Sequence, residues 1–191
     1  MTVRVLGIGG SLRRGSLSAA AVTVALKGAA EAGADTEMLR LSDLDLPLFN
    51  PDRPQRDAPG VGALLAAVRA ADGLVVGTPV YGGTLSGAVK NMLDLVHLLK
   101  EETPPVLTGK VVGLVAASGL PEGRSATVSM ETACRNLAAW VEPQHVVLSE
   151  DAFDASGEVY DQFARGELLA LGFKLAATAS ARRDGRAEMV G

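Results

Sequence analysis

Short apolar runs rich in Val, Leu and Ile recur along the chain, and the segments between them have helical spacing. Nearly continuous apolar runs are typical of strands that are covered on both faces, as in a parallel sheet. The run at 36–41 alternates more between apolar and polar residues, which indicates a strand nearer the sheet edge. The predicted strands are residues 3–8, 36–41, 73–77, 111–117 and 145–149.

The intervening segments place apolar residues at the i, i+3, i+4 and i+7 positions that share one face of a helix. The predicted helices are residues 17–30, 61–68, 86–99, 130–141 and 159–177. Strands that alternate with helices predict a doubly wound α/β architecture. Neither a repeat nor a linker divides the chain, so we expect a single domain over residues 1–179 and a polar, frayed tail at 180–191.

Composition excludes several classes of protein. The chain has 191 residues, of which 48% are hydrophobic and 21% charged, as in an ordinary globular protein. A net charge of −4 argues against non-specific binding to nucleic acid. No apolar stretch approaches the roughly 18 residues of a membrane span, and the N-terminus lacks a signal-peptide pattern. The single cysteine, Cys134, excludes an internal disulfide, so we expect a cytoplasmic protein that binds neither nucleic acid nor a membrane.

The stretch Gly9-Gly-Ser-Leu-Arg-Arg-Gly-Ser16 lies between the first predicted strand and the first predicted helix. Ligands of open parallel sheets bind beyond the carboxyl ends of the strands, and a helix N-terminus there favours an anion. Two familiar phosphate motifs fail. No lysine for a Walker loop occurs before Ala25, and Leu12 occupies the third glycine position of the dinucleotide fingerprint.

The hydroxyls of this stretch instead suit a terminal phosphate monoester. Ser11, Ser16 and Ser18 supply hydrogen-bond donors, and Arg13 supplies a charge-assisted bond. The alternative is that Ser16 or Ser18 only caps the helix. We favour phosphate binding because glycines and arginines accompany the serines directly after a strand.

A second polar stretch, Thr78-Pro-Val-Tyr-Gly-Gly-Thr, follows the third predicted strand. Pro79 ends that strand, and the glycines allow the backbone to approach a flat ligand. Tyr81 offers a ring and a hydroxyl at the same edge. A third loop, residues 117–124, has small residues that suit hydrogen bonds to a ring edge. Taken singly, each of these stretches is also compatible with a plain turn.

With these motifs, the chain resembles the NAD(P)H-dependent FMN reductases over about residues 2–178. Gly10-Ser-Leu-Arg-Arg-Gly-Ser16 is similar to that family's Gly-Ser-x-Arg-x-x-Ser phosphate loop. Thr78-Pro-Val-Tyr81, followed by Ser86-Gly-Ala-Val-Lys-Asn91 and Leu93-Asp94, is similar to its flavin-ring loop and helix. The resemblance implies a flavodoxin-like fold, with a five-stranded parallel sheet in the order 2-1-3-4-5 and helices on both faces.

The resemblance also implies roles for particular residues. Ser18 stands where asparagine is common in the family, and Gly82 and Thr84 also depart from the pattern of some members. The residues implied to hold the FMN phosphate are Ser11, Arg13, Ser16 and Ser18; those implied to line the ring are Pro79, Val80, Tyr81 and Gly82, with Ser118 and Gly119 at its pyrimidine side.

The implied activity is reduction of bound FMN by NADPH or NADH, with electrons passed to free flavin, a quinone, an azo dye or a metal oxyanion. Because the flavin carries the hydride chemistry, no catalytic side chain or metal is expected. We interpret His97, His145 and Cys134 as structural residues. Arg14 and Arg124 are both candidates for contact with a 2′-phosphate, and the sequence does not decide between the two coenzymes.

Two further functions and an assembly are considered. A flavodoxin-like electron carrier is disfavoured because aromatic residues make up only 4% of the chain, which leaves one ring face open to nicotinamide. A flavin-binding regulatory module is the other alternative. The family resemblance and the many apolar residues of 92–99 predict a homodimer or homotetramer with helix 86–99 at the interface.

Overall fold

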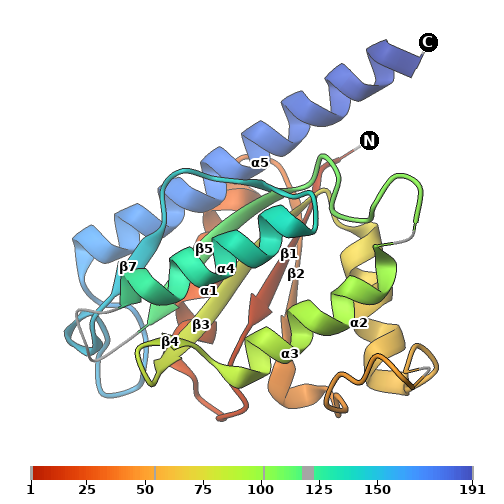
Figure 1. Ribbon diagram of the computed structural model, residues 1–191. Helices are drawn as coiled ribbons and strands as arrows, with labels where there is room; N and C mark the ends of the chain where they lie inside the picture. The colour runs from red at the N-terminus through yellow and green to blue at the C-terminus, as the bar shows by residue number, and fades with distance from the viewer. Residues whose placement is uncertain (1, 54, 101, 118–122, 191) are drawn as a thin grey trace.

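A parallel sheet between two layers of helices forms the protein (Figure 1). The computed structural model describes residues 2–53, 55–100, 102–117 and 123–190, with residues 184–190 described for the backbone only. The parallel strands are β1 (Arg4–Gly9), β2 (Asp35–Arg40), β3 (Gly73–Tyr81), β5 (Val111–Ala117), β6 (Trp140–Val141) and β7 (Val146–Leu148).

The strand order confirms the predicted topology. The sheet runs β2-β1-β3-β5, and β6 and β7 both pair with β5 on its outer side. Gly9 of β1 is paired with Gly77 of β3, and Thr78 is paired with Ala116 of β5. Because these strands end at nearly the same level, the loops that follow β1, β3 and β5 share one edge of the sheet.

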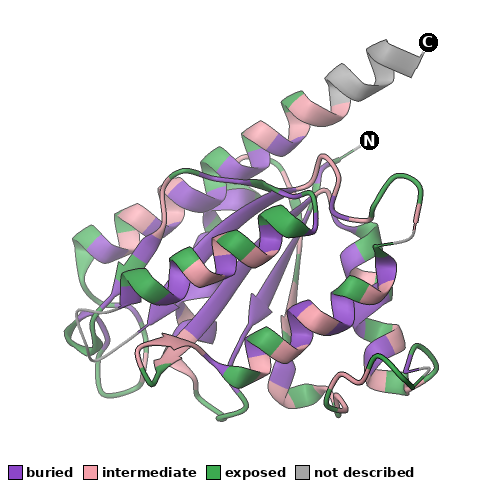
Figure 2. Ribbon diagram, in the orientation of Figure 1, coloured by how far each residue is buried: buried purple, intermediate pink, exposed green. Residues whose placement is uncertain are grey.

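The helices divide between the two faces of the sheet. Helices α2 (Pro59–Ala70), α3 (Gly87–Val96) and α4 (Gly123–Asn136) pack on one face, and α1 (Leu17–Glu31) and α5 (Gln162–Val190) pack on the other (Figure 1). Each face buries its own apolar cluster, and the central strands β1, β3 and β5 are buried over most of their length, whereas the edge strand β2 is not (Figure 2). Short 3-10 turns occur at Leu41–Asp43, His97–Leu99 and Glu150–Ala152.

The predicted helix over 130–141 is wrong at both ends. Helix α4 begins at Gly123 and ends at Asn136. Ala138 then adopts a left-handed backbone conformation with φ of 67°, and a right-handed helix cannot continue through such a residue. Val141 is buried as part of β6 and not as part of a helical stripe. Val141 therefore fits the helical spacing only by chance, because β6 follows α4 after a short connection.

The last helix is longer than predicted. Helix α5 continues to Val190, so the backbone of residues 180–190, for which we expected a frayed tail, is helical. This segment contains three Arg and two Ala, which are strong helix formers, and its polarity does not oppose a helix. The two-residue antiparallel strand β4 (Thr84–Leu85), which pairs with β3, was not predicted either.

Helices α1 and α5 pack closely because glycine allows their backbones to approach each other. A Cβ added at Gly172 of α5 would overlap the carbonyl oxygen of Ala25, and one added at Gly28 of α1 would overlap that of Leu169. Gly166, also in α5, has nothing within 4 Å of the position where a Cβ would lie.

Alanine substitutions at these two glycines of α5 should therefore change stability in opposite directions. We expect Gly172→Ala to lower the free energy of unfolding by about 1–3 kcal/mol, because the added methyl forces the helices apart. Gly166→Ala should raise it by about 0.5–1 kcal/mol through helix propensity alone. Urea unfolding of the two variants measures both changes, and a Gly172→Ala variant as stable as the Gly166→Ala variant would contradict this packing.

Candidate functional site

The loop that follows β1 is joined to strand β3 at Gly10. The prediction that Pro79 ends this strand is wrong, because Pro79 pairs with Ala117 and β3 continues to Tyr81. The backbone N–H of Gly10 donates to the carbonyl oxygen of Gly77, with 2.9 Å between the two atoms. A Cβ at position 10 would overlap that same oxygen and a methyl group of Val89. Only glycine therefore allows the first loop to leave the sheet in contact with β3.

Two buried hydroxyls complete this junction. Ser86 Oγ donates to the carbonyl oxygen of Gly10 at 2.8 Å and accepts from the N–H of Val89, which caps α3. Thr78 Oγ1 accepts from the N–H of Ser86 at 3.0 Å and donates to the carbonyl oxygen of Pro79. Both side chains are at most 1% exposed. One hydrogen-bonded unit thus holds three segments together: the loop after β1, the end of β3 and the start of α3. We call residues 10–16 the phosphate loop, for the role expected of them, and residues 78–83, the end of β3 and its turn, the β3 loop.

The sequence motifs do not reveal that Ser86 and Thr78 form this junction, although both residues lie in the quoted motifs. Ser86 precedes a helical segment, so its capping role was visible as a serine before an apolar-periodic stretch. Its bond to Gly10 joins residues 76 positions apart, and no local pattern carries that information.

The phosphate loop is shaped by its own serines. Ser11, 5% exposed, accepts the N–H of Arg13 at its hydroxyl, with 3.1 Å between the atoms. The hydroxyls of Ser16 and Ser18 lie 2.8 Å apart and hydrogen-bond to each other. Gly15 has a φ of +66°, which allows the loop to turn into the helix.

Helix α1 starts without a side-chain cap. Ser16 occupies the N-cap position, yet its hydroxyl does not accept from the helix, and the first turn carries no acidic residue. The alternative that these serines only cap the helix is therefore not what the structure shows. The positive end of the helix dipole and the N–H groups of the first turn are left for an external acceptor.

A cavity of about 320 Å³ brings most of the predicted site residues together. It contains one predicted group from the phosphate loop and one from β3, and it adds lining residues that were not predicted. The predicted members are Ser11, Arg13, Ser16, Ser18, Pro79, Val80 and Tyr81, and the added ones are Gly15, Leu17, Ala117 and Glu150. Gly82 does not line this cavity, and Ser118 and Gly119 lie outside the described residues.

Gly82 and Gly83 form the turn of a small hairpin. Their φ values of 58° and 77° suit the two-residue turn that joins β3 to β4. Helix α4 holds the hairpin, because Ser125 Oγ donates to the carbonyl oxygen of Gly83 and Thr84 Oγ1 lies 3.2 Å from Ser129 Oγ. The hairpin fixes the backbone next to Tyr81, whose side chain is 57% exposed at the cavity rim.

The residues interpreted as structural do not line this cavity. Burial raises the pKa of the Cys134 thiol to about 12, so it is a neutral core residue at physiological pH. His145 lies 3.4 Å from a carboxylate oxygen of Glu131, and desolvation lowers its pKa despite that carboxylate. His97 is exposed. Within the described ranges there is no group of three or more His, Cys, Asp or Glu placed to hold a metal ion.

Over the part of the chain that the structure describes, no helix is both long enough and apolar enough to cross a bilayer.

Comparison with known proteins gives consistent matches over most of the chain. The sequence profile of the NADPH-dependent FMN reductases matches residues 3–154. An NAD(P)H-dependent FMN reductase of Pseudomonas aeruginosa is 32% identical over 171 residues, covering 85% of this chain and 88% of that protein. A quinone reductase of Escherichia coli is 30% identical over 181 residues, covering 89% of this chain and 94% of that protein.

A solved structure shares the fold. A flavoenzyme NAD(P)H:(acceptor) oxidoreductase from Paracoccus denitrificans superimposes with a TM-score of 0.75 at 22% identity, covering 95% of this chain and 99% of that one. The profile match extends over both segments that line the cavity. The chain therefore belongs to the NADPH-dependent FMN reductase family.

Proposed function

We propose that this protein binds FMN in the cavity between the phosphate loop and the β3 loop, and that it uses NADPH or NADH to reduce small-molecule electron acceptors. The observation that carries the proposal is the junction of two chemically different walls in one cavity. Ser11, Ser18 and Arg13 lie at one wall, and Pro79 and Tyr81 lie at the other.

The residues of this cavity fit FMN. The phosphate monoester of FMN requires several donors and a cation, and the buried hydroxyls, Arg13 and the uncapped start of α1 supply them. The isoalloxazine ring requires a flat surface, and the backbone of Pro79-Val80-Tyr81 provides one beside Ala117. Each end of the cavity thus has the chemistry that the corresponding end of FMN needs.

When bound, FMN supplies the redox chemistry by accepting hydride from nicotinamide and passing electrons to an acceptor. The side chains of the cavity have the task of binding and orientation. Arg13 and the serines hold the phosphate, and the hairpin tied to α4 keeps the β3 loop in place. No described side chain is required to act as a nucleophile, and the buried, neutral Cys134 is unsuited to that role.

The acceptor is proposed to be free flavin, a quinone, an azo dye or a metal oxyanion. The exposed rim at Tyr81 supports access for small molecules of differing shape. The names of the relatives, an FMN reductase and a quinone reductase, support flavin and quinone as acceptors. We further propose a cytoplasmic location, which the single, buried cysteine supports.

We also propose a homodimer or homotetramer, and membership of the family is what supports this assembly. The apolar residues of 92–99 suggested an exposed stripe. In the structure Met92, Leu93, Leu95, Val96 and Leu99 are buried within the chain, and Leu98 is partly buried. The core of one chain therefore accounts for this helix, and its apolar content does not by itself indicate an interface.

The visible spectrum of the protein tests the proposed activity. After addition of FMN and removal of the excess, we expect a retained flavin absorption band that NADPH or NADH bleaches without oxygen. A retained band that neither coenzyme bleaches would favour the electron-carrier function. No retained band and no turnover with excess FMN would contradict the proposal.

Substitution of Arg13 tests the phosphate wall. We expect Arg13→Ala to weaken FMN binding by about 1.5–3 kcal/mol, the usual contribution of a hydrogen bond to a charged group, and toward the lower end because the side chain is exposed. Fluorescence titration with FMN measures the change. Lys27→Ala, an exposed cation further along α1, is the matched control and should bind like the unsubstituted protein. Equal affinities of both variants would remove Arg13 from the site.

A further inference from the structure

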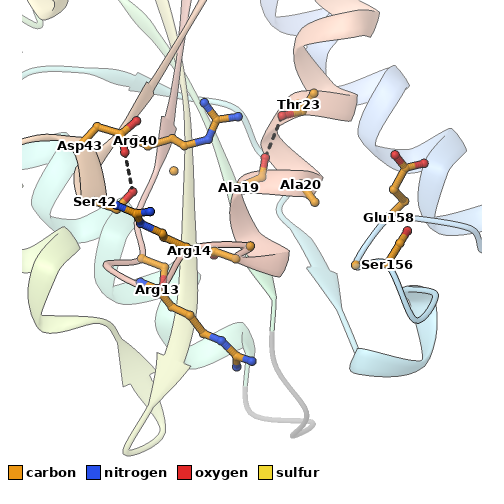
Figure 3. Close-up of a pocket in the computed structure, with 15 residues that line it drawn as sticks. Arg13, Arg14, Ala19, Ala20, Thr23, Arg40, Ser42, Asp43, Ser156 and Glu158 are labelled. Carbon is orange, nitrogen blue, oxygen red and sulfur yellow. Dashed lines mark hydrogen bonds between the residues drawn. The ribbon is translucent and has the colours of Figure 1, made fainter.

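A second cavity, of about 510 Å³, lies on the β2 side of the phosphate loop (Figure 3). The FMN cavity reaches toward β3, whereas this one is lined by Arg40, Ser42 and Asp43 from the end of β2. The two cavities share Ser11, Arg13, Gly15 and Ser16, so the phosphate loop is the wall between them. We call the second cavity the β2 groove.

Cations gather at one end of the β2 groove. Figure 3 shows Arg14 and Arg40 on one side of α1, whereas Arg13 points away from Arg40. Within the described part of the chain neither Arg14 nor Arg40 makes an ion pair. Asp43, an acid in the same lining, accepts a hydrogen bond from Ser42 at 3.1 Å. Two guanidinium groups that face one groove without an acidic partner are suited to an anion such as phosphate.

The middle of the groove is lined by residues with small side chains. Its floor is made by Ala19 and Ala20 of α1, with Gly9 and Gly157 beside them. Side chains this small leave the backbone surface accessible, and a planar ring can lie against it without displacing a larger group. The first turns of α1 thus lie between Arg14 and Arg40 on one side and Ser156 and Glu158 on the other (Figure 3).

The far end of the groove carries an acceptor on a fixed loop. Asp154 Oδ1 accepts from the N–H of Ser156 at 2.9 Å, from the hydroxyl of Ser156 at 2.6 Å and from the N–H of Glu158 at 3.0 Å. These bonds lower the pKa of Asp154 and fix the turn through Gly157, whose φ is +83°. The loop presents the Glu158 carboxylate, which accepts hydrogen bonds from hydroxyl or amino groups (Figure 3).

We propose that the β2 groove binds the phosphate-bearing adenosine part of a dinucleotide. Arg14 and Arg40 hold its phosphate, the purine lies on Ala19 and Ala20, and Glu158 accepts a hydrogen bond from the adenine amino group. In adenosine monophosphate the ribose joins the phosphate to the purine, and the amino group lies on the side of the ring away from the ribose, so the molecule has this order of anion, flat ring and donor.

Two dinucleotides contain this chemistry. One is FAD, whose second phosphate and adenosine continue past the phosphate loop that the two cavities share. The other is NADPH, whose 2′-phosphate distinguishes it from NADH. Which of the two dinucleotides binds here depends on the proposed function. That the groove binds an adenosine phosphate does not depend on it.

Calorimetric titration of the FMN-saturated protein with 5′-AMP and with 2′-AMP tests the groove directly. We expect at least one of them to bind, and the Arg14→Ala/Arg40→Ala double variant to lose about tenfold or more in affinity. Arg53→Ala, an exposed arginine that lines neither cavity, is the control and should bind as the unsubstituted protein does. FMN affinity should be the same in all three proteins.

Two further measurements on the same variants distinguish the sources. A loss of FAD affinity with FMN affinity unchanged supports the proposal with FAD as the source. A rise in the KM for NADPH with that for NADH unchanged supports it with NADPH as the source. Failure of both AMP isomers to bind, or binding that survives the double substitution, would overturn the proposal. Failure of FMN itself to bind would instead count against the proposed function.

Discussion

The candidate site depends on the hydrogen bonds that join Gly10 to β3 and α3. Gly10 donates its N–H to Gly77, and its carbonyl oxygen accepts from Ser86. Both backbone polar groups of Gly10 are thereby paired at a buried position. An intramolecular hydrogen bond contributes only about 1 kcal/mol net, whereas a buried carbonyl left without its donor costs about 1–3 kcal/mol. The two loops are consequently held in one arrangement.

That arrangement explains how this cavity suits a redox cofactor, which carries its own chemistry and needs binding and orientation from the protein. The sheet brings the ends of β1, β3 and β5 to one edge, and the junction then fixes the phosphate loop against the β3 loop. Binding energy is available at the phosphate end through Arg13 and the start of α1. The β3 end, held by its hairpin to α4, provides a surface of fixed shape. A rigid cavity of this kind orients a cofactor without reordering the protein.

The sequence was informative where a local pattern has a single physical meaning. Gly10, Ser11 and Arg13 follow an apolar run directly, and parallel topology then places them at the ligand edge. Long-range bonds such as that from Ser86 to Gly10 leave no local pattern, so the junction was not predicted. The helix end at Asn136 depends on the left-handed backbone of Ala138, a conformation that alanine rarely adopts, and no residue pattern indicates it. Glu158 belongs to a loop far along the chain, and only the fold brings it to the same groove as Arg40.

The most direct test of this account is the FMN affinity of the Ser86→Ala variant. The affinity of Ser86→Thr and the free energies of unfolding of both variants are measured beside it. Ser86→Ala leaves the Gly10 carbonyl oxygen without its donor, so the phosphate loop can move away from β3. The account predicts that the affinity falls by about tenfold or more in a variant that remains folded, and that Ser86→Thr, which keeps the hydroxyl, recovers much of it. An Ser86→Ala variant that is less stable but binds FMN unchanged would show that the junction supports the fold and not the site.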